Sequence, residues 1–96
     1  MKAVFIIYNE AHGENVREAM EKCFVRGFTM WEQVQGTGTK DGEPHLGSHA
    51  WPTMNSAIVT FVEDEAARRL KERLKEYDAL KPKLGLRVFT WTIDED

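Results

Sequence analysis

Cysteine is nearly absent from this chain of 96 residues, in which Cys23 is the single example. One thiol cannot form an internal disulfide, so the fold must depend on its hydrophobic core, and the composition fits a reducing compartment. Long apolar runs are missing too, since no stretch approaches the roughly 20 residues that a membrane-spanning helix needs. The first residues also lack the order of charged, apolar and small residues that marks a signal peptide. We therefore expect a cytoplasmic protein that does not itself span a membrane.

A strong excess of one charge is also lacking. The formal net charge is −3, and charged residues of both signs make up 30% of the chain and are mixed along it. Because nucleic-acid-binding surfaces need a basic patch or stripe, this pattern argues against a nucleic-acid partner. Hydrophobic residues form 42% of the sequence, which is ordinary for a globular protein. The length suits one domain, which we assign to residues 1–96.

Hydrophobic periodicity indicates alternating strands and helices. Residues 3–8 are continuously apolar or aromatic, which is typical of a short strand covered on both faces. Apolar residues then recur at helical spacing from about Glu14, and Gly27 stands where a helix C-cap is expected. A second helical pattern begins with the acidic residues Glu63 and Asp64, which complement the helix dipole. The predicted strands cover residues 3–8, 28–35, 56–62 and 86–93.

Each predicted helix has an apolar stripe that should face the core. The stripe of the first helix includes Cys23, which we interpret as a small apolar filler. The other stripe residues are Val16, Ala19, Met20 and Phe24 in the first helix and Ala66, Ala67, Leu70, Leu74 and Tyr77 in the second.

The order of elements, βαββαβ, predicts an α+β fold of the ferredoxin-like type, a four-stranded antiparallel sheet with two helices on one face. Strands one and three are central in that layout, and their residues alternate between two apolar sets. The helices can cover only one set, so the other would form a large apolar patch. Burial against further copies of the chain, in a symmetric homo-oligomer, is the simplest way to cover it. In the first strand the two sets are Ala3, Phe5 and Ile7 against Val4, Ile6 and Tyr8, and we expect Trp31 and Trp91 of the edge strands at a subunit contact.

The longest connection in the predicted fold runs from Gly36 to Pro52, between the second and third strands. It holds four of the seven glycines and two of the three histidines. Adjacent strands need only about two to five residues between them, so connectivity alone does not explain its length. Because loops this long in small domains are usually functional or disordered, we predict that the function of the chain resides in this segment.

In the order of its elements and the position of this connection, the chain resembles the PII signalling superfamily over roughly residues 1–93. That superfamily contains trimeric ferredoxin-like proteins, the nitrogen-regulatory PII proteins and, more distantly, the CutA proteins. PII proteins carry a long T-loop at this place, which docks onto transporters, enzymes or regulators. The strand before the T-loop ends in Gly-x-Gly followed by a basic residue and a glycine, and Gly36-Thr37-Gly38-Thr39-Lys40-Asp41-Gly42 is similar.

The resemblance implies a homotrimeric regulatory protein with residues 36–52 as its T-loop and a partner such as a membrane transporter. It also implies a ligand- or anion-binding role for Gly36, Gly38 and Lys40, because glycines let the backbone approach a bound anion closely. Residues 80–85, however, lack the glycine-rich pattern that holds nucleotide phosphates in PII proteins, and residues 36–52 lack the modifiable tyrosine. The sequence therefore does not predict nucleotide binding and leaves the ligand unidentified.

Two histidines in the long connection suggest a metal site. His45 and His49 are four positions apart, but Pro44 and Gly47 disfavour a helix there, so a chelate would depend on loop geometry. Imidazole ligands suit zinc, copper or nickel better than magnesium. A divalent transition metal is therefore the open cofactor candidate, and a CutA-like metal-binding protein is an alternative function. The other interpretation is that both are ordinary exposed histidines.

Trp51, at the end of the connection, has two interpretations. It either pins the base of the segment to the body of the protein or anchors a partner, and Pro52 stiffens the return into the next strand. We carry Trp51 as a candidate partner-docking residue.

Catalytic residues are not indicated by the sequence. Cys23 should point into the core, which disfavours a Cys–His nucleophile, and Ser48 and Ser56 have no evident base beside them. We therefore expect a protein that is not an enzyme. A small dimeric enzyme with a ferredoxin-like fold is the remaining alternative.

Overall fold

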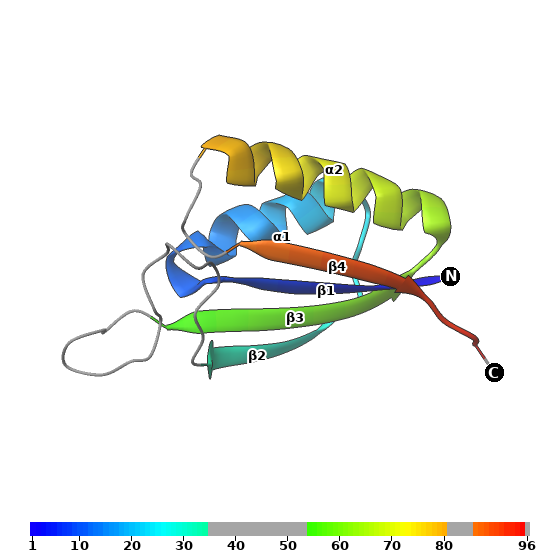
Figure 1. The fold of residues 1–96 in the computed structure, drawn as a ribbon, viewed down its shortest axis with the longest axis horizontal. Coiled ribbons are helices and arrows are strands. Elements are labelled where there is room, and N and C mark those ends of the chain that lie inside the picture. The colour runs from blue at the N-terminus through cyan, green and yellow to red at the C-terminus, as the bar shows by residue number, and fades with distance from the viewer. Residues whose placement is uncertain (35–53, 81–85, 96) are drawn as a thin grey trace.

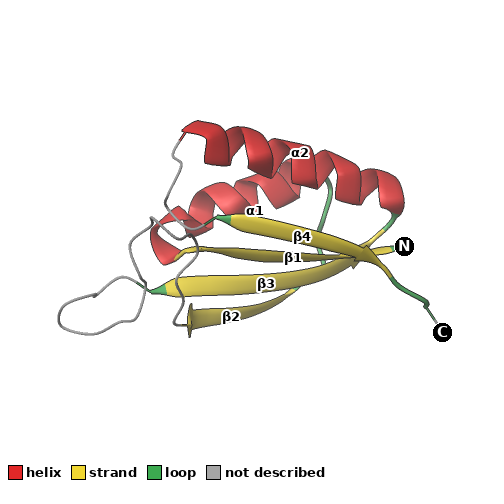
Figure 2. Ribbon diagram, viewed as in Figure 1, coloured by secondary structure: helices red, strands yellow, loops and turns green. Residues whose placement is uncertain are grey.

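The computed structural model describes residues 1–34, 54–80 and 86–95. Within these ranges four strands form one antiparallel sheet, and two helices lie over one of its faces (Figures 1 and 2). The strands are β1 (Lys2–Asn9), β2 (Thr29–Val34), β3 (Asn55–Val62) and β4 (Arg87–Thr92), and the helices are α1 (Gly13–Lys22) and α2 (Asp64–Leu80), with the short 3-10 helix η1 (Glu10–His12) before α1.

The strand order is β2-β3-β1-β4, which places β1 and β3 in the centre and β2 and β4 at the edges. β1 pairs along its whole length with β3, from Lys2 opposite Val62 to Asn9 opposite Asn55, and β4 flanks β1 on its other side. This order, with both helices on the same face, confirms the predicted ferredoxin-like arrangement.

The hydrophobic core lies between the sheet and the helices. Alternate residues of β1 point toward the helices, so Val4, Ile6 and Tyr8 are buried there. Cys23 is also buried in this core, as the sequence predicts. The helices contribute Val16, Ala19 and Met20 from α1 and Ala67, Leu70 and Leu74 from α2.

α1 ends earlier than its apolar spacing predicts. Its last residue is Lys22, and Phe24 has φ 59, in the left-handed region that favours glycine. The chain therefore leaves the helix before Gly27, and the Phe24 side chain is 77% exposed. The predictions that Phe24 belongs to the buried stripe and that Gly27 caps the helix are wrong.

β2 is irregular near its end. Trp31 lies opposite Ala57 and Val34 lies opposite Asn55, so β2 advances three residues while β3 advances two. One spare residue in an antiparallel pair is a β-bulge. Gln33, which has φ 56 and an exposed side chain, lies within this irregular stretch.

α2 begins with acidic residues, as the sequence predicts, and carries exposed ion pairs. Arg68 contacts Glu72 at 2.9 Å and Arg69 contacts Glu65 at 3.7 Å, both four residues apart along the helix. Exposed pairs of this kind contribute little to stability, so they support the helix without fixing its position. Within the described residues, no helix is long and apolar enough to cross a membrane.

Candidate functional site

The face of the sheet opposite the helices carries a group of aromatic side chains, which we call the open sheet face. The pairing register places Phe5 between Phe89 and Val59, and it places Ala3 between Trp91 and Phe61. Paired residues point to the same side of a sheet, and this side is the one that Val4, Ile6 and Tyr8 do not face. The aromatic residues that are about half exposed here are Trp31, Phe61, Phe89 and Trp91.

This surface has the composition of a protein contact. Contiguous exposed patches of large apolar side chains are uncommon on monomers and usually mark an interaction site. The sequence predicts that one of the two apolar sets remains uncovered, and the structure identifies it as the set that contains Phe5 and Ile7. Trp31 and Trp91 lie on the edge strands within this face, where a subunit contact was expected.

A second candidate site lies at the base of the long connection. Val34 and Met54 are the described residues on either side of that connection. The backbone N–H of Glu10 donates to the carbonyl of Met54 at 3.0 Å, which ties the end of β1 to the start of β3. A pocket of about 320 Å³ opens beside this contact. Its polar lining residues are Tyr8, Glu10, Arg17, Glu32 and Ser56.

The phenol of Tyr8 is the most buried polar group in this pocket. Its hydroxyl donates to the sulfur of Met30 at 3.6 Å, and the residue is 1% exposed. Burial raises the pKa of Tyr8 above its ordinary value, and the negative charge of Glu32 acts in the same direction. A hydrogen bond with Ser56 and the positive charge of Arg17 oppose that change in pKa without cancelling it. The pocket therefore offers the hydroxyl groups of Tyr8 and Ser56 beside one guanidinium and the two carboxylate side chains of Glu10 and Glu32.

We expect the Tyr8 phenolate to form only above pH 10.0, the ordinary pKa of tyrosine. The pKa of Tyr8 is higher in the folded than in the unfolded chain. The contribution of neutral Tyr8 to the free energy of unfolding is therefore fully present below pH 10.0, and it is lost as the pH rises through the pKa of the folded chain. Absorbance of phenolate followed during alkaline titration, compared between the wild type and Tyr8→Phe, measures this directly. If the wild type shows a phenolate transition at or below pH 10.0 that Tyr8→Phe lacks, the raised pKa of Tyr8 is wrong.

The sequence-predicted site residues lie in residues 35–53, outside the described ranges, and they stay predictions. His12, the third histidine, is described, and its Nδ1 lies 2.6 Å from the hydroxyl of Tyr77, which also accepts a hydrogen bond from Asn15. Within residues 1–34, 54–80 and 86–95, no group of three or more His, Cys, Asp or Glu side chains is placed to hold a metal ion. The predicted residues outside those ranges are Gly36, Gly38, Lys40, His45, His49 and Trp51.

Sequence reasoning missed the pocket at the base of the connection. In the hydrophobic pattern of the sequence, Tyr8 and Ser56 do not differ from other strand residues. The signal that could have found them is their position, because Tyr8 ends the first buried strand and Ser56 starts the third, and antiparallel pairing brings those ends together.

Comparison with known proteins identifies the family. A sequence profile of the family described as nitrogen regulatory protein P-II matches residues 1–95. The chain belongs to the P-II family. P-II proteins are signalling proteins that typically form trimers and bind partners. Among curated protein sequences, none matches the chain significantly.

Solved structures of P-II-like proteins share the fold. CPII, a nitrogen regulatory PII-like protein from Thiomonas intermedia K12 bound to ADP, AMP and bicarbonate, superposes with a TM-score of 0.76 at 21% identity, covering 94% of this chain and 82% of that one. Its apo form gives a TM-score of 0.65 at 20% identity, with coverage of 94% and 85%. A PII-like signalling protein from Thermus thermophilus gives 0.65 at 21% identity, with coverage of 94% and 82%. At these identities the likeness establishes the ferredoxin-like fold of the P-II family.

Proposed function

We propose that this P-II family chain is a cytoplasmic, homotrimeric regulator and not an enzyme. In this proposal residues 36–52 bind a small ligand or a divalent metal and dock onto a partner such as a membrane transporter. The observation that carries the proposal is the family match over residues 1–95, since P-II proteins are signalling proteins.

The open sheet face supports the trimer. Phe61 and Phe89 are 56% and 53% exposed on it, and no described element covers them. Removing apolar surface from water contributes about 25 cal/mol per Å², so a contact between copies would stabilise the assembly. P-II proteins typically form trimers, and an apolar sheet face is suited to such a contact.

The proposed ligand sites lie in the long connection and next to its base. Gly36, Gly38 and Lys40 are proposed to hold an anion, and His45 and His49 a transition metal. CPII was solved with ADP and bicarbonate, which makes these two compounds reasonable first ligands to test. The pocket beside Tyr8 and Arg17 could read the state of the segment, because its lining residues Glu32 and Ser56 lie close in sequence to the two ends of the segment.

The proposed mechanism is a change of population. A ligand that binds only one arrangement of residues 36–52 increases the fraction of molecules in that arrangement. A partner that docks through Trp51 and recognises one arrangement then binds more or less strongly. No covalent chemistry is needed for this signal.

Sedimentation velocity and thermal denaturation of the full chain test the proposal together. We expect a trimer, and we expect one of ADP, bicarbonate or zinc to stabilise it, by about 2.7 kcal/mol at a hundred times its Kd. Gly36→Ala/Gly38→Ala/Lys40→Ala should abolish a response to an anion, and His45→Ala/His49→Ala a response to zinc. Lys75→Ala, an exposed change on α2, is the control.

Each result has a defined meaning. A trimer whose anion response is lost only in the glycine–lysine variant supports the regulator. A response to zinc alone, lost only in the histidine variant, favours the metal-binding alternative. A chain that is monomeric and responds to none of the three compounds overturns the proposal.

A further inference from the structure

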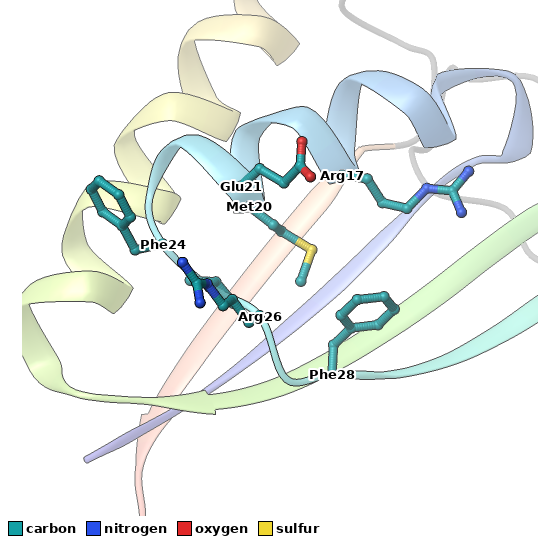
Figure 3. Close-up of a pocket in the computed structure, with 7 residues that line it drawn as sticks. Arg17, Met20, Glu21, Phe24, Arg26 and Phe28 are labelled. Carbon is teal, nitrogen blue, oxygen red and sulfur yellow. The ribbon is translucent and has the colours of Figure 1, made fainter.

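A second pocket lies beside α1, away from the open sheet face, and it shares Arg17 with the pocket at the base of the long connection. It is a hollow of about 580 Å³ between the C-terminal half of α1 and the segment that leads into β2 (Figure 3). Figure 3 shows Met20 pointing from α1 toward Phe28, with Phe24 and Arg26 toward one end and Arg17 toward the other. This volume and an apolar lining with a few charged groups are typical of small-molecule sites.

The backbone conformation and the exposed side chain of Phe24 do not stabilise the folded chain. Its backbone has φ 59, which costs a non-glycine residue about 1 kcal/mol or more. Its phenyl ring is 77% exposed, so burial returns little of that cost. Phe28, on the opposite wall, is 43% exposed. Two aromatic rings are therefore presented to the same hollow at a conformational cost that a glycine at position 24 would avoid.

The two arginines of the pocket have unused hydrogen-bonding capacity. Within the described ranges, neither Arg17 nor Arg26 makes an ion pair or a side-chain hydrogen bond, whereas Arg68 on α2 contacts both Glu65 and Glu72. Arg26 lies between the two phenylalanines in the chain, and its guanidinium points toward the Phe24 side of the pocket (Figure 3). A guanidinium in this setting can bind a carboxylate with two parallel hydrogen bonds.

Glu21 limits the charge that the pocket can accept. It lies in the α1 wall with Arg17, which also borders the pocket beside Tyr8. With Arg26, the charged lining of two arginines and one glutamate sums to +1. This charge matches a monoanion and opposes a polyphosphate, which would bring several negative charges close to the Glu21 carboxylate.

We propose that this pocket binds a small aromatic carboxylate. The ring lies over Met20 between Phe24 and Phe28, where aromatic and sulfur–aromatic contacts are favourable. The carboxylate pairs with Arg26. The site lies on the helix-bearing side of the sheet, and its ligand contacts Met20, Phe24, Arg26 and Phe28 do not line the pocket beside Tyr8. It therefore does not depend on the proposed trimer or on the ligand of residues 36–52.

Calorimetric titration of the full chain with phenylacetate tests the proposal, with two matched probes. Phenylacetamide has the same ring without the charge, and acetate has the charge without the ring. We expect phenylacetate to bind saturably with a Kd below about 10 mM, and both matched probes to bind at least tenfold more weakly. Arg26→Gln should weaken phenylacetate at least tenfold, and Phe24→Gly about fivefold, because the guanidinium and the phenyl ring are the contacts removed.

Phe24→Gly separates binding from folding. Glycine relieves the left-handed backbone, so the thermal midpoint of this variant should be unchanged or higher while its affinity falls. Arg73→Gln, an exposed arginine on α2 outside the pocket, should bind phenylacetate like the wild type. The proposal is overturned if phenylacetate gives no saturable heat, if phenylacetamide binds as tightly, or if neither pocket variant changes the affinity.

Discussion

Phe89→Asp is expected to dissociate the proposed trimer into folded monomers. Phe89 lies on the open sheet face opposite Phe5, and about half of its surface is exposed in the single chain. An aspartate there would be hydrated in a monomer and cost little. In a contact between copies the same carboxylate would be buried without a partner, at a cost of several kcal/mol for each copy.

Sedimentation velocity distinguishes the two states, and far-ultraviolet circular dichroism reports whether the monomer stays folded. Leu80→Asp is the matched control, because Leu80 is 79% exposed at the end of α2 and lies off the open sheet face. The control should sediment like the wild type. If Phe89→Asp also sediments like the wild type, the open sheet face is not the contact between copies.

Leu70→Ala is expected to lower the free energy of unfolding by about 3 kcal/mol, within the 2–5 kcal/mol range for buried leucines. Leu70 is fully buried on the face of α2 that contacts the sheet, in the same cluster as Ile6 and Ile58. Removing these side-chain atoms loses the free energy gained by burying them away from water. It also leaves a cavity, because the neighbouring central strands cannot move to fill it. For a domain of this size the thermal midpoint should fall by roughly 10–20 °C.

Thermal denaturation at one fixed protein concentration measures this change, since association between copies makes the midpoint depend on concentration. Leu80→Ala, with the same chemical change at an exposed position, should move the free energy of unfolding by less than about 0.5 kcal/mol. Equal effects of the two substitutions would mean that the interior of the protein is not organised around Leu70.

The strands could be predicted because each carries a compact apolar run that local signals delimit. The apolar runs of β1 and β3 predict strands covered on both faces, and the two are the central pair. In the single chain, however, the helices cover only one face, and Phe61 on the other is 56% exposed. α2 could be predicted with its acidic start and its buried Leu70 and Leu74, since periodicity and dipole effects point the same way. The position of Phe24 could not, because helical periodicity continues through it while the backbone has already turned into the left-handed region. Gly27, three residues later, offered a more conventional cap.

The open sheet face could be predicted only in part. Alternation in β1 separates Phe5 from Ile6, but it does not say which of them the helices cover. That choice follows from the right-handed crossover between β1 and β2, a property of the whole chain. The pocket that contains Phe24, Arg26 and Phe28 could not be predicted for the same reason, since it exists only where the end of α1 lies beside the segment leading to β2.

The bulge near Gln33 gives the sheet a natural stopping point for fraying. Four residue pairs join β2 to β3, with a gap between Trp31 and Val34, whereas eight join β3 to β1. Tension on the neighbouring connection would therefore first peel Val34 from Asn55, and the loss would halt at Trp31. The central strands β1 and β3 would keep their pairing register while the end of the edge strand β2 opened and closed.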